Sequence, residues 1–136
     1  MAAIGHRIAF AVLGFAGIVV AVSGIAAEPG GNDGAEREIA GLVEALGASD
    51  CEFQRNGRWH SVGEARAHLQ RKLDRARKRG LSGTAEQFIE RAASRSSVSG
   101  RTYRVRCADG YEGASADWFG RELRRLRQAN SSQSPR

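Results

Sequence analysis

The sequence predicts a small α+β domain with the element order α-β-β-α-α-β-α. Apolar residues at helical spacing recur in separate segments, an Asn-Gly pair joins two short extended segments, and a strictly alternating segment follows late in the chain. The hairpin and the late strand together predict a short antiparallel sheet packed by helices. We expect one domain over residues 35–128, stapled by one disulfide.

The N-terminus has the pattern of a cleavable secretory signal peptide. A basic start that contains Arg7 precedes the almost entirely apolar residues 8–25, and small residues follow up to Ala27. The alternative is an uncleaved membrane anchor, because about 20 apolar residues span a bilayer. The small residues and the lack of a basic stop-transfer flank favour cleavage. We therefore expect residues 1–27 to be a Sec-type signal peptide, the protein to be periplasmic, and no stable membrane anchor to remain.

The chain contains two cysteines, Cys51 and Cys107, and both follow the predicted signal peptide. In an oxidising compartment an even pair is expected to form a disulfide. Closing a loop of this length stabilises the fold by about 4 kcal/mol on the chain-entropy model. A disulfide also removes the thiolate that a nucleophilic pair or a zinc site with His60 or His68 requires. We accordingly predict a structural disulfide, no metal and no cofactor.

The first helix is predicted over residues 35–46, after a flexible segment at residues 28–34. The flexible segment is rich in glycine and has no apolar residue. The helix has one apolar face with i, i+3, i+4, i+7 spacing, formed by Ile39, Leu42, Val43 and Leu46. Gly47 suits the end of this helix.

A β-hairpin is predicted directly after the first helix. Residues 51–55 alternate apolar and polar side chains, as a half-buried strand does. The Asn56-Gly57 pair predicts a type I′ turn, since both residue types tolerate positive φ. Residues 58–60 then form the returning strand.

Two capping boxes mark the next two helices. Ser61 with Glu64 begins a helix that ends at Gly80, and Thr84 with Gln87 begins a shorter one. The outer face of the longer helix carries the basic residues Arg66, Arg71, Lys72, Arg75 and Lys78. The expected buried residues of the shorter helix are Phe88, Ile89 and Ala92.

The last predicted elements are a strand and a helix, separated by a turn region. Residues 101–107 alternate strictly, which predicts a strand that pairs with the hairpin in a three-stranded sheet. Residues 108–115 have the composition of a turn, and a helix with a second basic face begins near Ser115. The polar residues 129–136 are expected to form a disordered tail.

Five segments carry a family resemblance. In chain order they are "CEFQRNG", "EARAHLQRK", "TAEQFIERAAS", "SSVSGRTYRVRC" and "SADWFGRELRRL". The chain resembles the YfeK-like family of small exported bacterial proteins, a domain of unknown function, from about Leu46 to Arg127. The resemblance implies a location in the cell envelope of a Gram-negative bacterium. It supplies no activity, so no catalytic residue is carried over.

The candidate ligand-binding site is centred on polar side chains of the resembling segments. A turn role accounts for Asn56-Gly57 but explains Arg55, His68 and Lys72 poorly. His68 and Lys72 share one helix face at i, i+4 spacing, and the hairpin just before them contributes further polar groups. The hydroxyl-rich stretch before Gly100 adds polar groups to the set. The predicted residues are Arg55, Asn56, Arg58, His68, Lys72, Ser96 and Ser97. The alternative interpretation is a solvated surface with ordinary turns.

The charge balance predicts an acidic partner. The net charge is +6, which favours an anionic envelope component or an acidic protein, whereas export disfavours nucleic acid. We expect a non-enzymatic binding or interaction module. The alternative is a small envelope hydrolase that uses His68 and a serine of residues 94–99 on a cell-wall or lipid substrate. That stretch lacks the G-x-S-x-G elbow and the S-x-x-K pairing of known serine enzymes. The sequence leaves the oligomeric state open.

Overall fold

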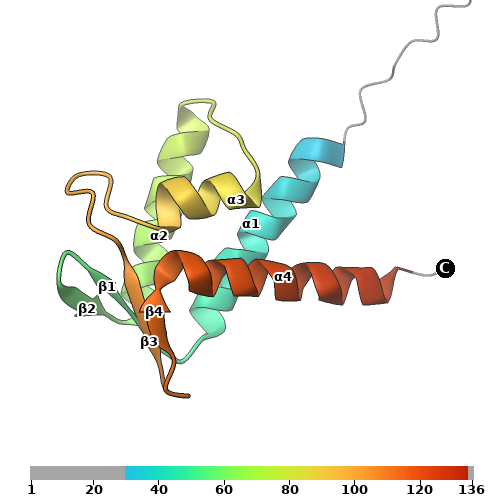
Figure 1. The fold of residues 1–136 in the computed structure, drawn as a ribbon. Helices are drawn as coiled ribbons and strands as arrows, with labels where there is room; N and C mark the ends of the chain where they lie inside the picture. Colours follow the sequence, from blue (N-terminus) through green and yellow to red (C-terminus); the bar gives the residue numbers. More distant parts are fainter. Residues whose placement is uncertain (1–29, 135–136) are drawn as a thin grey trace, which may run out of the picture.

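The computed structural model describes residues 30–134 of the chain, and the predicted signal peptide at residues 1–27 lies outside them. Within the described residues, no helix combines the length and the apolar character needed to cross a membrane. The predicted α+β class, its element order and its disulfide are confirmed. Figure 1 shows the sheet at one side of the molecule, with the helices gathered beside it.

The elements follow one another with short connections. In chain order they are α1 (Gly30–Ala48), β1 (Cys51–Arg55), β2 (Arg58–His60), α2 (Val62–Lys78), α3 (Ala85–Phe88), the π-helix η1 (Ile89–Ala93), β3 (Arg104–Cys107), β4 (Glu112–Ala114) and α4 (Ser115–Gln133).

The sheet is antiparallel throughout and has the strand order β2-β1-β3-β4. The turn between β1 and β2 has positive φ at both Asn56 and Gly57, as the Asn-Gly pair predicts. In the pairing of β1 with β3, Cys51 lies directly opposite Cys107, and the two form the disulfide.

One strand differs from the expectation of a three-stranded sheet. The edge strand β4 lies within residues 108–115, for which a turn is predicted, and it pairs with β3. Three residues with a central glycine are too few to show the two-residue alternation that identifies a strand. Its pairing with β3, which no local pattern reveals, makes the segment a strand.

Both terminal helices are longer than predicted. Helix α1 begins at Gly30, and α4 continues to Gln133, so much of the expected flexible segment 28–34 and of the expected tail 129–136 is helical. The added turns are exposed, and an exposed helical turn needs no apolar residue that a pattern could detect. In α4 the hydroxyls of Ser131 and Ser132 donate to the carbonyls four residues earlier.

The core lies between the inner face of the sheet and the helices. Alternation along the late strand directs Tyr103 and Val105 inward, as predicted. Phe53 on β1 and Phe119 on α4 each meet Trp118, with interplanar angles of 88° and 89°. Such edge-to-face pairs are a preferred aromatic geometry, and they fix α4 against the sheet.

The π-helix η1 shifts which residue of its segment is buried. The sequence predicts Ala92 in the core, but Ala93 is buried and Ala92 is only half-buried. A π-turn contains an extra residue, so the residue stacked with buried Phe88 is Ala93, at i+5, rather than Ala92, at the i+4 of an α-helix. The Ser94 hydroxyl donates to the Ile89 carbonyl at 2.6 Å and so closes the segment.

Candidate anion-binding site

A cavity of about 610 Å³ lies between α2, the α3–η1 segment and the loop that joins η1 to β3. One wall is a stripe on α2, where successive spacings of four, three and four residues place side chains on one helix face. The stripe comprises His68, Lys72 and Arg75 of α2 and Arg79, the residue that caps the end of the helix. The α3–η1 segment adds Arg91, and the loop adds Ser96 and Ser97.

The lining of this cavity is strongly basic. It includes five basic side chains, those of Arg55, Lys72, Arg75, Arg79 and Arg91. Within residues 30–134, none of the five forms an ion pair with a carboxylate. Glu36, the one acidic lining residue of the described part of the chain, is already paired with Arg77. Like charges gathered in a concave surface reinforce one another's field, so this cavity attracts anions.

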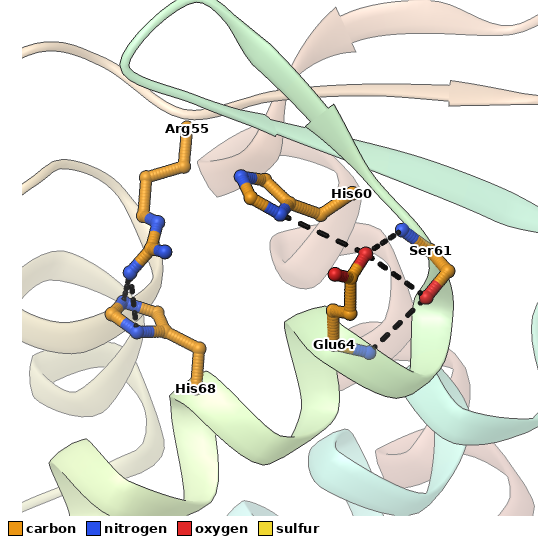
Figure 2. A network of polar contacts seen from close by, with 5 residues as sticks. All are labelled: Arg55, His60, Ser61, Glu64 and His68. Atoms are coloured by element: carbon orange, nitrogen blue, oxygen red, sulfur yellow. Dashed lines mark hydrogen bonds and ion pairs between the residues drawn. The ribbon is translucent and has the colours of Figure 1, made fainter.

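Arg55 and His68 form the central contact of the site (Figure 2). The Arg55 Nη1 atom lies 2.7 Å from His68 Nδ1. A guanidinium only donates hydrogen bonds, so Nδ1 accepts and the ring proton resides on Nε2, which lies 3.3 Å from Tyr103 Oη. Burial, followed by the charges of Arg55 and Lys72, lowers the pKa of His68 to about 4. The imidazole is therefore neutral at pH 7.

A second, smaller cavity of about 250 Å³ adjoins this contact. Arg55, His68 and Tyr103 line both cavities, so they form a polar partition between them. Burial raises the pKa of Tyr103, which keeps its hydroxyl protonated and neutral within the partition. The small cavity has a largely apolar base, to which core side chains such as Phe53 and Phe119 contribute.

The rim of the small cavity includes a second polar pair (Figure 2). His60 Nδ1 lies 3.8 Å from Glu64 Oε2. The same carboxylate accepts a hydrogen bond from the Ser61 backbone amide, which completes the predicted capping box. This hydrogen bond is the main reason why the pKa of Glu64 is lowered. The pair therefore combines a cap of α2 with the wall of the small cavity.

Lys72 connects α2 to the end of the π-helix. Its Nζ atom donates to the carbonyls of Ala92 at 2.8 Å and Arg95 at 3.4 Å. Nζ also lies 5.4 Å from the centre of the Tyr103 ring, within the range of a cation–π contact. Lys72 thus places its positive charge in the cavity wall and satisfies carbonyls that end η1.

The loop between η1 and β3 is organised by its own hydroxyl groups. The buried Ser96 Oγ accepts hydrogen bonds from the backbone amides of Val98 and Ser99. The Ser99 hydroxyl donates to Asn56 Oδ1 at 2.6 Å, which ties the loop to the hairpin tip. In Figure 1 the loop and the β1–β2 hairpin project on the same side of the molecule. Asn56 and Ser96 therefore shape the cavity, and Ser97 is exposed on its lining.

Six of the seven ligand-binding residues predicted from the sequence line the large cavity. The exception is Arg58, an exposed residue at the start of β2 that lines neither cavity. The lining also includes Arg75, Arg79 and Arg91. Of these, the sequence predicted only Arg75, as part of a basic outer helix face. The helical spacing from His68 to Arg79 was a usable signal for the α2 residues. Arg91 carries no such signal, because its position depends on the π-helix.

The described residues do not bring together the groups that a serine or cysteine nucleophile requires. Within residues 30–134, no serine hydroxyl makes a hydrogen bond with a histidine ring, and the His68 nitrogens face Arg55 and Tyr103 instead. Asp50 lies beside Cys51 and Cys107, but both sulfurs are bound in the disulfide and offer no thiolate.

Comparison with known proteins relates most of the chain to a family. Residues 33–127 match DUF5329, a family of unknown function. The uncharacterized protein YfeK of Salmonella typhimurium (strain LT2) is 44% identical over 69 residues, which cover 50% of this chain and 56% of that protein. The chain thus spans little more than half the length of this curated relative. No solved structure matches the chain.

Proposed function

The chain belongs to the DUF5329 family, whose function is unknown, and we propose that it is a non-enzymatic binding module for an anionic ligand. The observation that carries the proposal is the charge of the large cavity. Among the residues that the structure describes, five basic side chains without carboxylate partners line it, and its one acid is already engaged by Arg77. Transferring an anion into this field offsets the mutual repulsion of the five cations, which favours binding.

We further propose that the protein works in the bacterial cell envelope, after export. The signal-like N-terminus supports this location. The Cys51–Cys107 disulfide is consistent with it, because such bonds persist in oxidising compartments. Anionic lipids, anionic glycans and acidic proteins are the ligand classes present there that match the charge of the cavity.

The geometry supports binding better than hydrolysis. A hydrolase of the serine type needs a hydroxyl within hydrogen-bond reach of a base. His68 is the best-placed base of the large cavity, yet one ring nitrogen accepts from Arg55 and the other faces Tyr103. The Ser94 hydroxyl donates to the Ile89 carbonyl of η1, and the Ser96 hydroxyl accepts from a backbone amide of its own loop. These serines have a structural role that accounts for them.

The proposal is tested by NMR titration of the purified protein with matched anionic and neutral compounds. The anions are inorganic phosphate, methyl phosphate and octyl phosphate, and the neutral partners are methanol and octanol. We expect the anions to shift the backbone resonances of α2 and of the loop after η1, and the shifts to weaken with added salt. Arg75→Gln should reduce affinity about tenfold or more, since a charge-assisted hydrogen bond contributes about 1.5–3 kcal/mol.

The control variant is Arg124→Gln, which removes an exposed charge from α4, away from the lining of the cavity. It should bind the anions as the parent protein does. If no anion shifts these resonances more than its neutral partner does, the proposed function is wrong. An equal loss of affinity in Arg75→Gln and Arg124→Gln would also contradict it, because net charge alone would then explain the binding.

A further inference from the structure

We infer that the ligand of the large cavity is a single-chain anionic amphiphile, a linear hydrocarbon chain with a phosphate or carboxylate head. This inference rests on the proposed function and specifies the chemical class of the ligand. It is carried by three properties of the same cavity: its size, its apolar surface and the absence of an open aromatic platform.

The cavity is too large for a simple ion. A water molecule takes about 30 Å³ of liquid volume, and an inorganic oxyanion is only a few times larger. The cavity measures about 610 Å³, which lies within the range of about 300–1,000 Å³ that is typical of sites for organic ligands. An ion alone would leave most of this space to water, whereas an extended ligand would fill it.

Apolar side chains share the cavity with the five basic ones. Ile39, Leu73 and Phe88 are core residues that also contribute to its lining. The cavity further includes Leu81, which is 55% exposed, and Val98, which is 98% exposed. These two are the exposed large hydrophobic side chains of the described residues, and both lie at this one site.

The combination of apolar and basic lining residues selects an amphipathic ligand. Isolated exposed hydrophobic residues are ordinary, but two of them beside buried apolar residues offer a hydrocarbon chain a place out of water. The basic side chains around the same space offer its head charge-assisted hydrogen bonds. A purely polar anion would use only the second set of groups.

The aromatic rings of the site argue against a carbohydrate. Sugars commonly stack on open aromatic faces, and the rings that line the large cavity are those of Phe88, Tyr103 and His68. Phe88 is buried in the core. Lys72 lies over the Tyr103 ring, and the His68 ring packs against Tyr103 nearly perpendicularly, at 78°. The described residues of the site therefore present no free platform for stacking.

The inference is tested by calorimetric titration with methyl, butyl, hexyl and octyl phosphate, each below the concentration at which it aggregates. Burial of one methylene contributes about 0.8 kcal/mol, so affinity should rise about two- to fourfold per methylene, depending on how fully the chain is buried. Octanoate should follow the same trend as the phosphates. Octanol should bind at least tenfold more weakly than octyl phosphate, since it lacks the charge.

Two sets of variants separate the chain from the head. Leu81→Ser and Val98→Ser alter exposed side chains, so the fold should persist. Both variants should weaken the binding of octyl phosphate several-fold and leave the affinity for methyl phosphate unchanged. Arg75→Gln should lower the affinity for every anion of the series by a similar factor. Arg124→Gln serves as the control with unchanged affinities.

The possible failures are distinguishable. Equal affinities for methyl and octyl phosphate would overturn the amphiphile and leave anion binding intact. Failure of every anion to bind would overturn the proposed function as well. Binding to vesicles that contain phosphatidylglycerol, without binding of the monomeric alkyl phosphates, would overturn the inference in favour of a membrane surface.

Discussion

At the scale of single residues, the contact between Arg55 and His68 decides the chemistry of the site. Burial and then the charge of Arg55 lower the pKa of His68, which keeps the imidazole neutral. Because a guanidinium can only donate hydrogen bonds, the contact also fixes the ring proton on Nε2. A neutral imidazole in a basic cavity adds no charge of its own. The positive electrostatic field of the cavity therefore comes from its five lysine and arginine side chains.

The lowered pKa of His68 predicts a pH dependence of stability. In the unfolded chain the imidazole takes up a proton as the pH falls through about 6.5, whereas in the folded protein its pKa is lowered to about 4. The full contribution to stability is thus present above pH 6.5 and is lost progressively as the pH falls toward 4. Between pH 7.5 and pH 5 we expect a loss on the order of 1 kcal/mol, because partial exposure screens the charges.

Urea denaturation at the two pH values measures this loss, and histidine variants identify its source. His68→Gln should show a smaller change between pH 7.5 and pH 5 than the parent protein. His60→Gln, which alters the histidine beside Glu64, should retain the dependence on pH. A loss of the same size in His68→Gln and in the parent protein would rule out His68 as the cause.

At the scale of elements, the cavity depends on how three segments are held together. Lys72 binds α2 to the end of η1, and the Ser99–Asn56 hydrogen bond ties the loop before β3 to the hairpin. The disulfide joins β1 to β3 at the other end of the same strand pair. Each of these contacts connects segments that are distant in the sequence. The Lys72 and Ser99–Asn56 contacts hold walls of the cavity in place, whereas the disulfide lies outside its lining.

The disulfide predicts a clear effect of reduction on stability. Cys51 and Cys107 are separated by 56 residues, and removing a native disulfide from a small domain typically costs about 2–5 kcal/mol. We expect dithiothreitol to lower the urea midpoint of unfolding markedly. The Cys51→Ser/Cys107→Ser double variant should unfold at the lower midpoint and should not respond to the reductant. Equal midpoints for the oxidised and reduced parent protein would show that the disulfide contributes little.

At the scale of the whole molecule, the proposed location in the envelope predicts a processed N-terminus. When the full chain is expressed in a Gram-negative bacterium, we expect the protein released by osmotic shock to begin at Glu28. Intact mass spectrometry of that fraction checks this expectation. The small residue before the cut is required for processing, so Ala27→Phe should leave the unprocessed chain in the membrane fraction. Recovery of the parent chain at full length from the membrane fraction would instead indicate an uncleaved anchor.

Local patterns in the sequence determined much of the fold. The Asn56-Gly57 turn and the two capping boxes are formed by residues within a few positions of one another, so their geometry follows from residue type alone. The disulfide was predictable because the chain offers a single pairing of its two cysteines. Periodicity placed the inward faces of the helices and strands for the same local reason.

Only the tertiary structure decided which polar residues share a cavity. It excluded Arg58 and added Arg91, and it brought Tyr103 against His68. Tertiary contacts also determined that β4 is a strand and that the segment with Ala93 in the core is a π-helix. These features depend on contacts between segments far apart in the chain. Residue type and spacing determine local geometry, whereas the packing of whole elements determines which side chains meet.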